Sequence, residues 1–247
     1  MANLVIDIGN SYIKAAIFEG NELLRAEHYK TITIQQLDDL IAGQNVSRAI
    51  ISSVKKEKDS WEDKLTEKMP LVYFNRDMAK GITNQYLTPQ TLGIDRLVAV
   101  MGAHCLYPGA DNLIIDAGTC ITYDHVDAGG NYYGGSISPG LNMRFQAMHN
   151  YTSALPLVNA NSEFEKPFGD DTASAMLSGV QNGLKYELTG FIQSYRGSRP
   201  NLNILLTGGD GIFFDTLLKN SIFAPYIKNE PYLVLKGLNA AIQQHND

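Results

Sequence analysis

The sequence is poor in cysteine, in positive charge and in long apolar runs. Its two cysteines, Cys105 and Cys120, form no Cys-x-x-Cys pair, and its five histidines lack zinc-site spacing, which argues against a disulfide framework and a zinc site. A net charge of -6 argues against a nucleic-acid partner, because such proteins usually carry a basic face. No apolar run approaches the roughly 20 residues that span a bilayer, and the N-terminus meets Asp7 too soon for a secretory signal. These absences predict a cytoplasmic globular protein with neither a nucleic acid nor a membrane as partner.

What the sequence does contain is a short motif that occurs twice. Residues 7–11 read Asp-Ile-Gly-Asn-Ser, and residues 116–120 read Asp-Ala-Gly-Thr-Cys. Each motif follows a buried-looking apolar run and precedes two strand-like stretches that are separated by a Gly turn. The duplication predicts two homologous domains, 1–111 and 112–247, that face each other across a phosphate site.

The first motif has the residue types that bind phosphate. Gly9 lets a phosphate approach the backbone amides, Asn10 and Ser11 offer short polar side chains, and Lys14 supplies positive charge. Asp7 is suited to holding Mg²⁺, directly or through water. A single copy is better explained as a β-turn capped by its Asp, since short motifs recur by chance. The second copy reverses that preference and favours an ATP-dependent phosphotransferase.

A second cluster, Gly93-Ile94-Asp95-Arg96, precedes an apolar helix and has two interpretations. In the first, Asp95 is the N-cap of the helix and Arg96 is a solvated residue of its first turn, which the local sequence favours. In the second, Asp95 is a general base that accepts a hydroxyl proton during phosphoryl transfer, and Arg96 binds a substrate carboxylate through two parallel hydrogen bonds. Spacing alone does not choose between them.

The rest of the pattern predicts an α/β fold with mixed sheets flanked by helices. A last buried strand at 202–206 ends in Thr207-Gly208-Gly209, where glycines would let adenine or ribose lie on the backbone, although a plain strand-to-helix turn has the same sequence. A cluster of Pro, Gly and Asp near 108–112 predicts the domain boundary. Helices are expected at 34–42, 59–68, from 95 onward, 141–149, 172–195, 213–218 and 232–244.

Taken together, these motifs resemble the type III pantothenate kinases, within the superfamily that includes acetate and sugar kinases and actin. Gly-x-Asp-Arg with the Gly-Gly…Pro-Gly stretch separates this family from its superfamily relatives, and the likeness covers nearly the whole chain. The matching residues are Asp7, Gly9, Asn10, Ser11, Lys14, Gly93, Asp95, Arg96, Asp116, Gly118, Thr119, Thr122, Gly134, Gly135, Pro139, Gly140, Leu141, Ala154, Leu155, Pro156, Thr172, Ala175, Met176, Ser178, Gly179, Thr207, Gly208, Gly209 and Asp210.

The resemblance implies an enzyme that phosphorylates the hydroxyl of pantothenate with ATP, the first step of coenzyme A synthesis. It implies two RNase H-like, actin-like ATPase domains with the active site in the cleft between them, and a homodimer. Asp95 would be the catalytic base, and Mg²⁺ would accompany ATP. Asp116 would bind a monovalent cation, which would be potassium or, in its place, ammonium.

The resemblance also implies how the two substrates are held. Arg96 would bind the carboxylate of pantothenate. The residues around ATP would be Asp7, Ile8, Gly9, Asn10, Ser11, Tyr12, Ile13, Lys14, Thr119, Gly208 and Gly209. The residues around pantothenate would be Tyr86, Gly93, Ile94, Asp95, Arg96 and Thr172.

Two other functions stay open at this point. A non-catalytic accessory or regulatory relative would keep the fold without the chemistry, but the intact set Asp7, Asp95, Arg96 and Asp116 argues against it. A kinase for another small hydroxy acid or a sugar is the second, and Arg96 favours an acid. The chain departs from the family pattern at Ser11, where many relatives have Thr, and at Cys120, where relatives commonly have Ala.

Overall fold

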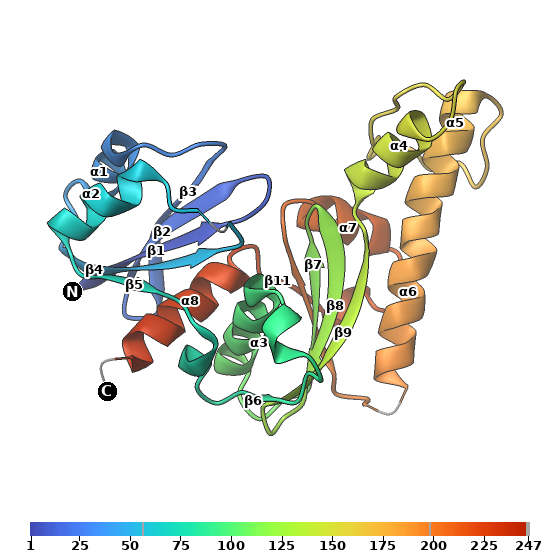
Figure 1. Cartoon of the computed structure of the whole chain (residues 1–247). Helices are drawn as coiled ribbons and strands as arrows, with labels where there is room; N and C mark the ends of the chain where they lie inside the picture. Colours follow the sequence, from blue (N-terminus) through green and yellow to red (C-terminus); the bar gives the residue numbers. More distant parts are fainter. Residues whose placement is uncertain (56, 198, 246–247) are drawn as a thin grey trace. The chain divides into compact units, whose positions relative to one another are not determined.

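The computed structural model describes residues 1–55, 57–197 and 199–245, and it divides into two compact units (Figure 1). The first unit consists of Met1–Pro108, Gly130–Tyr133 and the C-terminal segment from Tyr232 onward. The second unit consists of Gly109–Gly129 and Gly134–Pro231.

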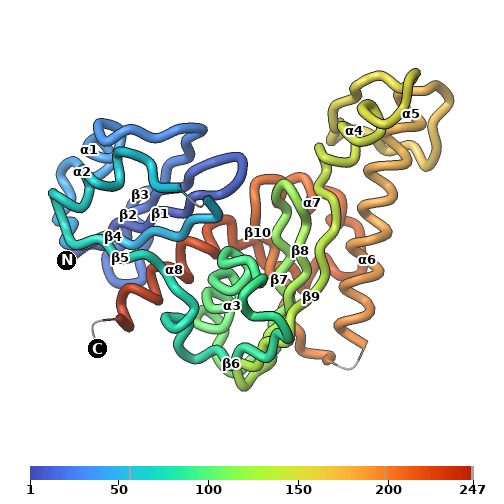
Figure 2. Tube along the Cα trace, in the orientation of Figure 1, coloured from blue at the N-terminus to red at the C-terminus, as the bar shows by residue number. Residues whose placement is uncertain are grey.

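These units differ from the predicted domains 1–111 and 112–247 because the first unit includes the C-terminal helix α8 (Leu233–Gln244) and the short segment Gly130–Tyr133. α8 lies beside α3 (Ile94–Leu106) in the first unit, as the chain trace in Figure 2 shows. The two helices approach closely because Gly237 has no side chain: a Cβ there would lie 2.2 Å from the carbonyl oxygen of Val98. The side-chain amide of Asn3 also donates a hydrogen bond to Asn239 Oδ1 at 2.9 Å, which ties α8 to the first strand.

The first unit is built on a five-stranded mixed sheet in the order β3-β2-β1-β4-β5. β1 is buried along its whole length, which explains why its apolar residues do not alternate with polar ones. It pairs antiparallel with β2 and parallel with β4, so that Asp7 lies opposite Lys14 on one side and Ser52 on the other. The strands are β1 (Ala2–Ile8), β2 (Ile13–Glu19), β3 (Glu22–Tyr29), β4 (Val46–Ser53) and β5 (Leu71–Tyr73).

One face of this sheet packs against α1 (Ile34–Ile41) and α2 (Ser60–Lys68). The shared core includes Ile6, Ile8 and Ile51 from the strands and Leu37 and Leu65 from the helices. Capping boxes fix the starts of both helices, at Thr33 with Gln36 and at Asp59 with Glu62. The first unit also contains β6 (Thr83–Asn84) and two short 3₁₀ turns, η1 (Arg76–Met78) and η2 (Pro89–Thr91).

The second sheet has six strands in the order β6-β9-β8-β7-β10-β11, and its strands β9-β8-β7-β10-β11 repeat the strand order of the first sheet. β7 pairs antiparallel with β8 and parallel with β10, so it corresponds to the central β1. β9 starts in the first unit, where its residues Asn131 and Tyr132 pair with β6. The strands are β7 (Asn112–Ala117), β8 (Cys120–Val126), β9 (Asn131–Pro139), β10 (Asn203–Thr207) and β11 (Ile227–Asn229).

The helices of the second unit enclose a core that contains Ile115, Leu184, Leu188 and Phe214. The long helix predicted over 172–195 forms, with one irregularity: α5 and α6 are joined by a π-helical segment, η3. Periodicity does not reveal such a local change in hydrogen bonding. The elements are α4 (Leu141–Asn150), α5 (Thr172–Leu177), η3 (Ser178–Asn182), α6 (Gly183–Arg196), α7 (Gly211–Leu218) and the 3₁₀ turn η4 (Ala224–Tyr226).

The predicted fold class, α/β with two mixed sheets flanked by helices, is confirmed. The observed helices begin and end within a few residues of the predicted bounds. Within the described part of the chain, no helix is long and apolar enough to cross a membrane.

Candidate active site

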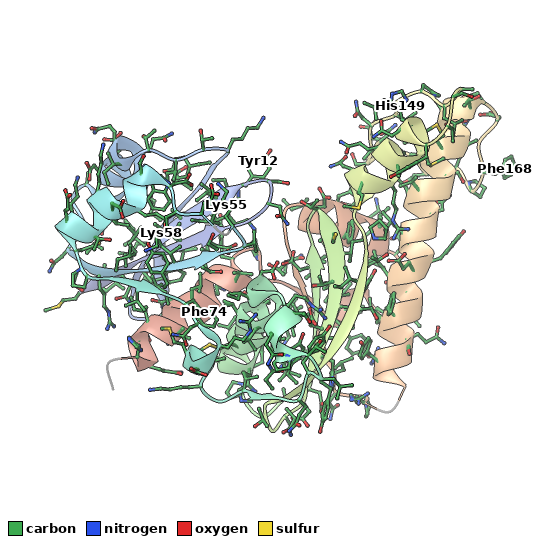
Figure 3. All side chains as sticks on the ribbon, viewed as in Figure 1. Tyr12, Lys55, Lys58, Phe74, His149 and Phe168 are labelled. Atoms are coloured by element: carbon green, nitrogen blue, oxygen red, sulfur yellow. The ribbon has the colours of Figure 1, made fainter. Side chains whose placement is uncertain are left out.

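The first Asp-x-Gly motif forms the hairpin loop between β1 and β2 in the first unit. The amide of Gly9 closes this loop by donating to the carbonyl oxygen of Tyr12 at 3.1 Å. Asn10, Ser11 and Tyr12 are exposed, and Tyr12 is labelled in Figure 3. Asp7 stands at the end of β1 with only 8% of its surface exposed, opposite the half-buried Lys14. The loop thus presents exposed backbone and short polar groups next to a carboxylate and a cation.

Asp7 has a second neighbour that the sequence analysis missed. Ser52, at the end of β4, pairs in register with Asp7 and is 1% exposed. Among the described residues, none forms a hydrogen bond with Ser52 Oγ. Mg²⁺ is commonly held by one or two carboxylates together with retained waters and substrate phosphates, and a carboxylate beside a buried hydroxyl fits such a hydrated ion. Ser52 could have been found from sequence only by aligning the carboxyl ends of two parallel strands.

The second Asp-x-Gly motif forms the hairpin loop between β7 and β8 in the second unit. The amide of Gly118 donates to the carbonyl oxygen of Cys120 at 3.1 Å, and Thr119 is exposed. Gly140, the N-cap of α4, packs on this loop and donates its amide to Thr119 O at 3.1 Å. A Cβ on Gly140 would lie 2.3 Å from that oxygen, so only glycine fits. The Pro-Gly pair of the family pattern therefore supports the second loop.

Gly208 brings the last glycine-rich turn against Asp116 within the second unit. Its backbone has φ +93°, and an added Cβ would lie 2.5 Å both from Ala117 O and from Asp116 Oδ1. Thr207 pairs in register with Asp116, and the amide of Asp210 donates to Ala117 O at 2.9 Å. Burial raises the pKa of the Asp210 carboxyl, which makes no capping hydrogen bond to α7. The structure thus joins two of the motifs that the sequence analysis treated separately.

The Gly93–Arg96 cluster forms the start of α3, and it corrects the N-cap interpretation. The N-cap is Gly93, while Asp95 lies inside the first turn and accepts a hydrogen bond from the amide of Arg96 at 2.9 Å. A Cβ on Gly93 would lie 2.5 Å from Asp95 Oδ1. Glycine therefore leaves room for the carboxylate to lie over the helix start.

Arg96 is 6% exposed, so the interpretation of Arg96 as a solvated residue is wrong. Its guanidinium lies over the ring of Tyr86, with 5.8 Å between the guanidinium carbon and the ring centroid. Tyr86 in turn stacks on the fully buried Tyr132, with the ring centroids 6.4 Å apart and the planes 8° from parallel. The Gln85 amide donates to Tyr132 O at 2.8 Å, which holds the segment in place. The structure thus brings the predicted Tyr86 and Arg96 together, and it adds Tyr132, which sequence analysis missed.

Thr172 is the first residue of α5 in the second unit and is exposed. Its neighbour Asp171 is the N-cap of α5, and its side chain accepts the Ser174 amide at 2.9 Å. A role of Thr172 in substrate binding stays a prediction.

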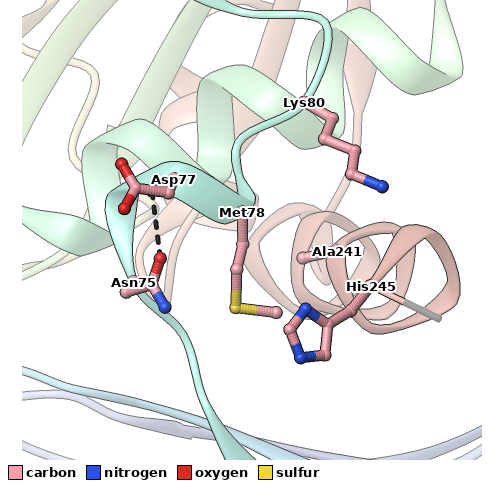
Figure 4. Close-up of a pocket in the computed structure, with 6 residues that line it drawn as sticks. All are labelled: Asn75, Asp77, Met78, Lys80, Ala241 and His245. Carbon is pink, nitrogen blue, oxygen red and sulfur yellow. Dashed lines mark hydrogen bonds between the residues drawn. The ribbon is translucent and has the colours of Figure 1, made fainter. Parts of the chain in front are cut away.

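A small cavity of about 160 Å³ lies elsewhere in the first unit, between η1 and α8 (Figure 4). None of the predicted site residues lines it; the lining residues are Asn75, Asp77, Met78, Lys80, Ala241 and His245. Within residues 1–55, 57–197 and 199–245, no group of three or more His, Cys, Asp and Glu side chains is arranged to hold a metal ion. A metal at Asp7 or Asp116 would therefore need ligands from water or from a bound nucleotide.

Comparisons with known proteins identify the family of this chain. A protein-family model described as type III pantothenate kinase matches residues 3–194. A type III pantothenate kinase from Phocaeicola vulgatus is 43% identical to this chain over 247 residues, which cover 99% of either protein.

Solved structures show the same fold at much lower identity. A protein described as a member of the Baf family of transcriptional activators, from Campylobacter jejuni, has a TM-score of 0.63 and 20% identity, covering 98% of both chains. An activator of a 2-hydroxyisocaproyl-CoA dehydratase from Clostridium difficile, with ADPNP bound, has a TM-score of 0.59 and 12% identity, covering 100% of this chain and 97% of the other. At these identities the likeness concerns the fold alone.

Proposed function

Because this chain belongs to the type III pantothenate kinase family, we propose that it transfers the γ-phosphoryl group of ATP to the hydroxyl of pantothenate, as the first step of coenzyme A synthesis. The observation that carries the proposal is the start of α3, where a carboxylate and a buried guanidinium stand on consecutive residues, Asp95 and Arg96. A substrate with a hydroxyl and a carboxylate needs both groups.

Asp95 is proposed as the general base that accepts the hydroxyl proton. Its carboxylate is held by the Arg96 amide and has space over Gly93. Phosphoryl transfer depends mostly on positioning and on charge neutralisation, so a carboxylate with a fixed orientation suits the role. General-base catalysis is worth about 10²–10⁴-fold in rate.

Arg96 is proposed to bind the substrate carboxylate. Its stacking over Tyr86, which is itself stacked on Tyr132, limits the directions in which the guanidinium can point. A planar, oriented guanidinium binds a carboxylate through two parallel hydrogen bonds, which is why an acid is favoured over a sugar. Gly93, Ile94 and Thr172 would complete the pantothenate pocket.

The ATP phosphates are proposed to lie on the loop of residues 9–12, in which residues 10–12 are exposed, with Lys14 as the cation. Asp7 would hold Mg²⁺, which neutralises phosphate charge when it is bound with the nucleotide. Ile8, Ile13 and, in the second unit, Thr119, Gly208 and Gly209 are the other proposed ATP residues. Asp116, whose carboxylate packs directly against Gly208, would hold a potassium or ammonium ion, as the family resemblance implies.

A homodimer and a cytoplasmic location are proposed as well. The segment between α4 and α5 exposes large apolar side chains, among them Tyr151 at 89% and Phe168 at 72%. Phe168 is labelled in Figure 3. Such side chains suit an interface with a second copy. Sedimentation equilibrium would report a dimer that Phe168→Ser weakens; a wild-type monomer at micromolar concentration would refute this part.

The function is tested by following ADP formation from ATP and Mg²⁺ with and without pantothenate, in matched potassium and sodium buffers. The expected result is turnover that requires pantothenate and falls when sodium replaces potassium. Turnover with a sugar or another hydroxy acid, but not with pantothenate, would refute the substrate. Failure to bind ATP would refute the kinase and favour a non-catalytic relative.

A further inference from the structure

We propose that Ser52 is a positioning residue of the phosphate-binding hairpin, whose hydroxyl acts with Asp7 to hold one water of a hydrated divalent cation bound with the nucleotide. This inference rests on the proposed function, because it takes the β1–β2 hairpin as the ATP-phosphate site. It adds a residue from β4 to a site otherwise formed by β1 and β2.

The first support is the register of the sheet. β1 and β4 run parallel, and Asp7 is paired with Ser52. Ile6, Ile8 and Ile51 face the core under α1 and α2. Because side chains alternate along a strand, Asp7 and Ser52 lie together on the opposite face, at the carboxyl ends of their strands.

The second support is the state of the Ser52 hydroxyl. It is buried, and the described residues provide it with no hydrogen-bond partner. Buried polar groups nearly always have a partner, because leaving one without costs free energy. The buried Ser52 hydroxyl lies beside the mostly buried Asp7 carboxylate. This position indicates a hydrogen-bond partner that is not part of the chain, such as a bound water.

The third support is the contrast with the next residue. Ser53 is half-buried, and its Oγ accepts a hydrogen bond from the Lys55 amide at 3.0 Å. Its hydroxyl is therefore used in a local turn of the chain. Ser52 has no comparable local role, although the two residues are chemically identical neighbours.

The fourth support comes from the second unit. There the strand parallel to β7 places Thr207 in register with Asp116. A hydroxyl residue therefore stands beside the motif aspartate in both units. This repetition indicates that a hydroxyl residue next to the aspartate is a feature of the duplicated motif and not of β4 alone.

The chemical class of the ligand follows from the two groups. A carboxylate accepts hydrogen bonds, and a serine hydroxyl can accept one and donate one. Mg²⁺ gives up its waters reluctantly and often binds proteins through them. A water held between Asp7 and Ser52 Oγ would fix the orientation of such an ion without a direct bond to the serine.

The test compares Ser52→Ala with Ser53→Ala in the full-length protein. The first readout is the affinity of the protein for Mn²⁺ in the presence of ADP. It is measured from the electron paramagnetic resonance signal of free Mn²⁺. We expect Ser52→Ala to weaken this binding by roughly 3- to 10-fold, the effect of one hydrogen bond. Ser53→Ala should stay within about twofold of wild type, and Ser52→Thr should restore binding.

Two further readouts separate positioning from a structural role. Without ligands, Ser52→Ala should melt at the same temperature as wild type or higher, because it removes a hydroxyl with no partner in the fold. In an Asp7→Asn background, Ser52→Ala should have little further effect on Mn²⁺ binding. A lower melting temperature with unchanged Mn²⁺ binding would overturn the proposal in favour of a structural serine.

The outcomes also distinguish this proposal from the proposed function. If wild type phosphorylates pantothenate and Ser52→Ala binds Mn²⁺ with ADP as wild type does, only the role of Ser52 is refuted. If Ser52→Ala weakens Mn²⁺ binding but pantothenate is not phosphorylated, the substrate is refuted and the role of Ser52 is supported. If wild type phosphorylates pantothenate but binds no Mn²⁺ with ADP, the cation site at Asp7 and Ser52 is refuted and the proposed function stands.

Discussion

The hairpins β1–β2 and β7–β8 follow one plan but differ where a ligand would touch them. In each, an aspartate is the penultimate residue of the central strand, a glycine amide closes the loop, and a hydroxyl residue stands in register on the parallel neighbour. Between the last paired residues, Ile8 with Ile13 and Ala117 with Ile121, the first hairpin has one residue more than the second. Opposite the aspartate, the first hairpin has Lys14 and the second has Thr122.

These differences show how a duplicated element can take two roles. A longer exposed loop with a cation beside it suits an anionic phosphate. A shorter loop without that cation, packed under Gly140 and against Gly208, leaves its aspartate suited to a metal ion. The proposed division, phosphate on the first hairpin and a monovalent cation at Asp116, follows from this contrast.

Glycine substitutions should show the largest difference between the two units. Gly208→Ala places a Cβ 2.5 Å from Ala117 O, in a residue with positive φ. We expect a loss of about 2–6 kcal/mol in the free energy of unfolding, from backbone strain and overpacking. Gly9→Ala meets only Tyr12 O at 3.2 Å, with φ outside the left-handed region, and should stay within about 1 kcal/mol of wild type. Urea unfolding of both variants measures this, and equal losses would contradict the comparison.

Substitution of the residues opposite the two aspartates should separate phosphate binding from metal binding. Lys14→Met removes the cation beside the first loop and should raise the KM for ATP by about 10- to 100-fold, the value of one charged hydrogen bond. Thr122→Val keeps the shape at the matching place in the second hairpin and should change this KM by less than about threefold. Steady-state kinetics at saturating pantothenate measure both. A larger effect from Thr122→Val would reverse the roles assigned to the hairpins.

Two helix-start aspartates of the second unit should give the smallest effects, with opposite signs. Burial raises the pKa of the Asp210 carboxyl in the folded state above its pKa in the unfolded state. As pH rises between these two pKa values, the carboxyl ionises more readily in the unfolded chain, and the free energy of unfolding falls. Asp210→Asn should therefore melt at a slightly higher temperature near pH 7. Hydrogen bonds from the Ser174 amide and hydroxyl lower the pKa of the Asp171 carboxyl in the folded state. The ionised Asp171 therefore stabilises the fold above its pKa in the unfolded state, and this stabilisation is lost as pH falls through its pKa in the folded state. Asp171→Asn should melt lower at pH 7, and melting curves from pH 3 to pH 7 would expose a wrong sign in either case.

Much of this comparison could be predicted from the sequence because it depends on local patterns. Asp-x-Gly after an apolar run identifies both strand ends, and Gly turns locate the strands that follow. The sequence predicts the start of α3 near Asp95, and the N-cap is Gly93. Local sequence does not separate the two, because glycine and aspartate are both common at helix N-caps.

The missed features depend on contacts between distant parts of the chain. Ser52 gains meaning only through its register with Asp7, and Tyr132 only through the pairing of β9 with β6. α8 joins the first unit because glycines on two helices meet, which spacing within either helix does not reveal. The burial of Arg96 likewise depends on Tyr86, which comes ten residues earlier in an irregular segment.

The central claim is that Asp95, at the start of α3, is the base of a pantothenate kinase. The most direct test measures phosphopantothenate formation by wild type and by Asp95→Asn at saturating ATP, together with ATP affinity and melting temperature. We predict that Asp95→Asn loses about 10²–10⁴-fold in turnover while fold and ATP binding are kept. Turnover close to wild type in that variant would contradict the account.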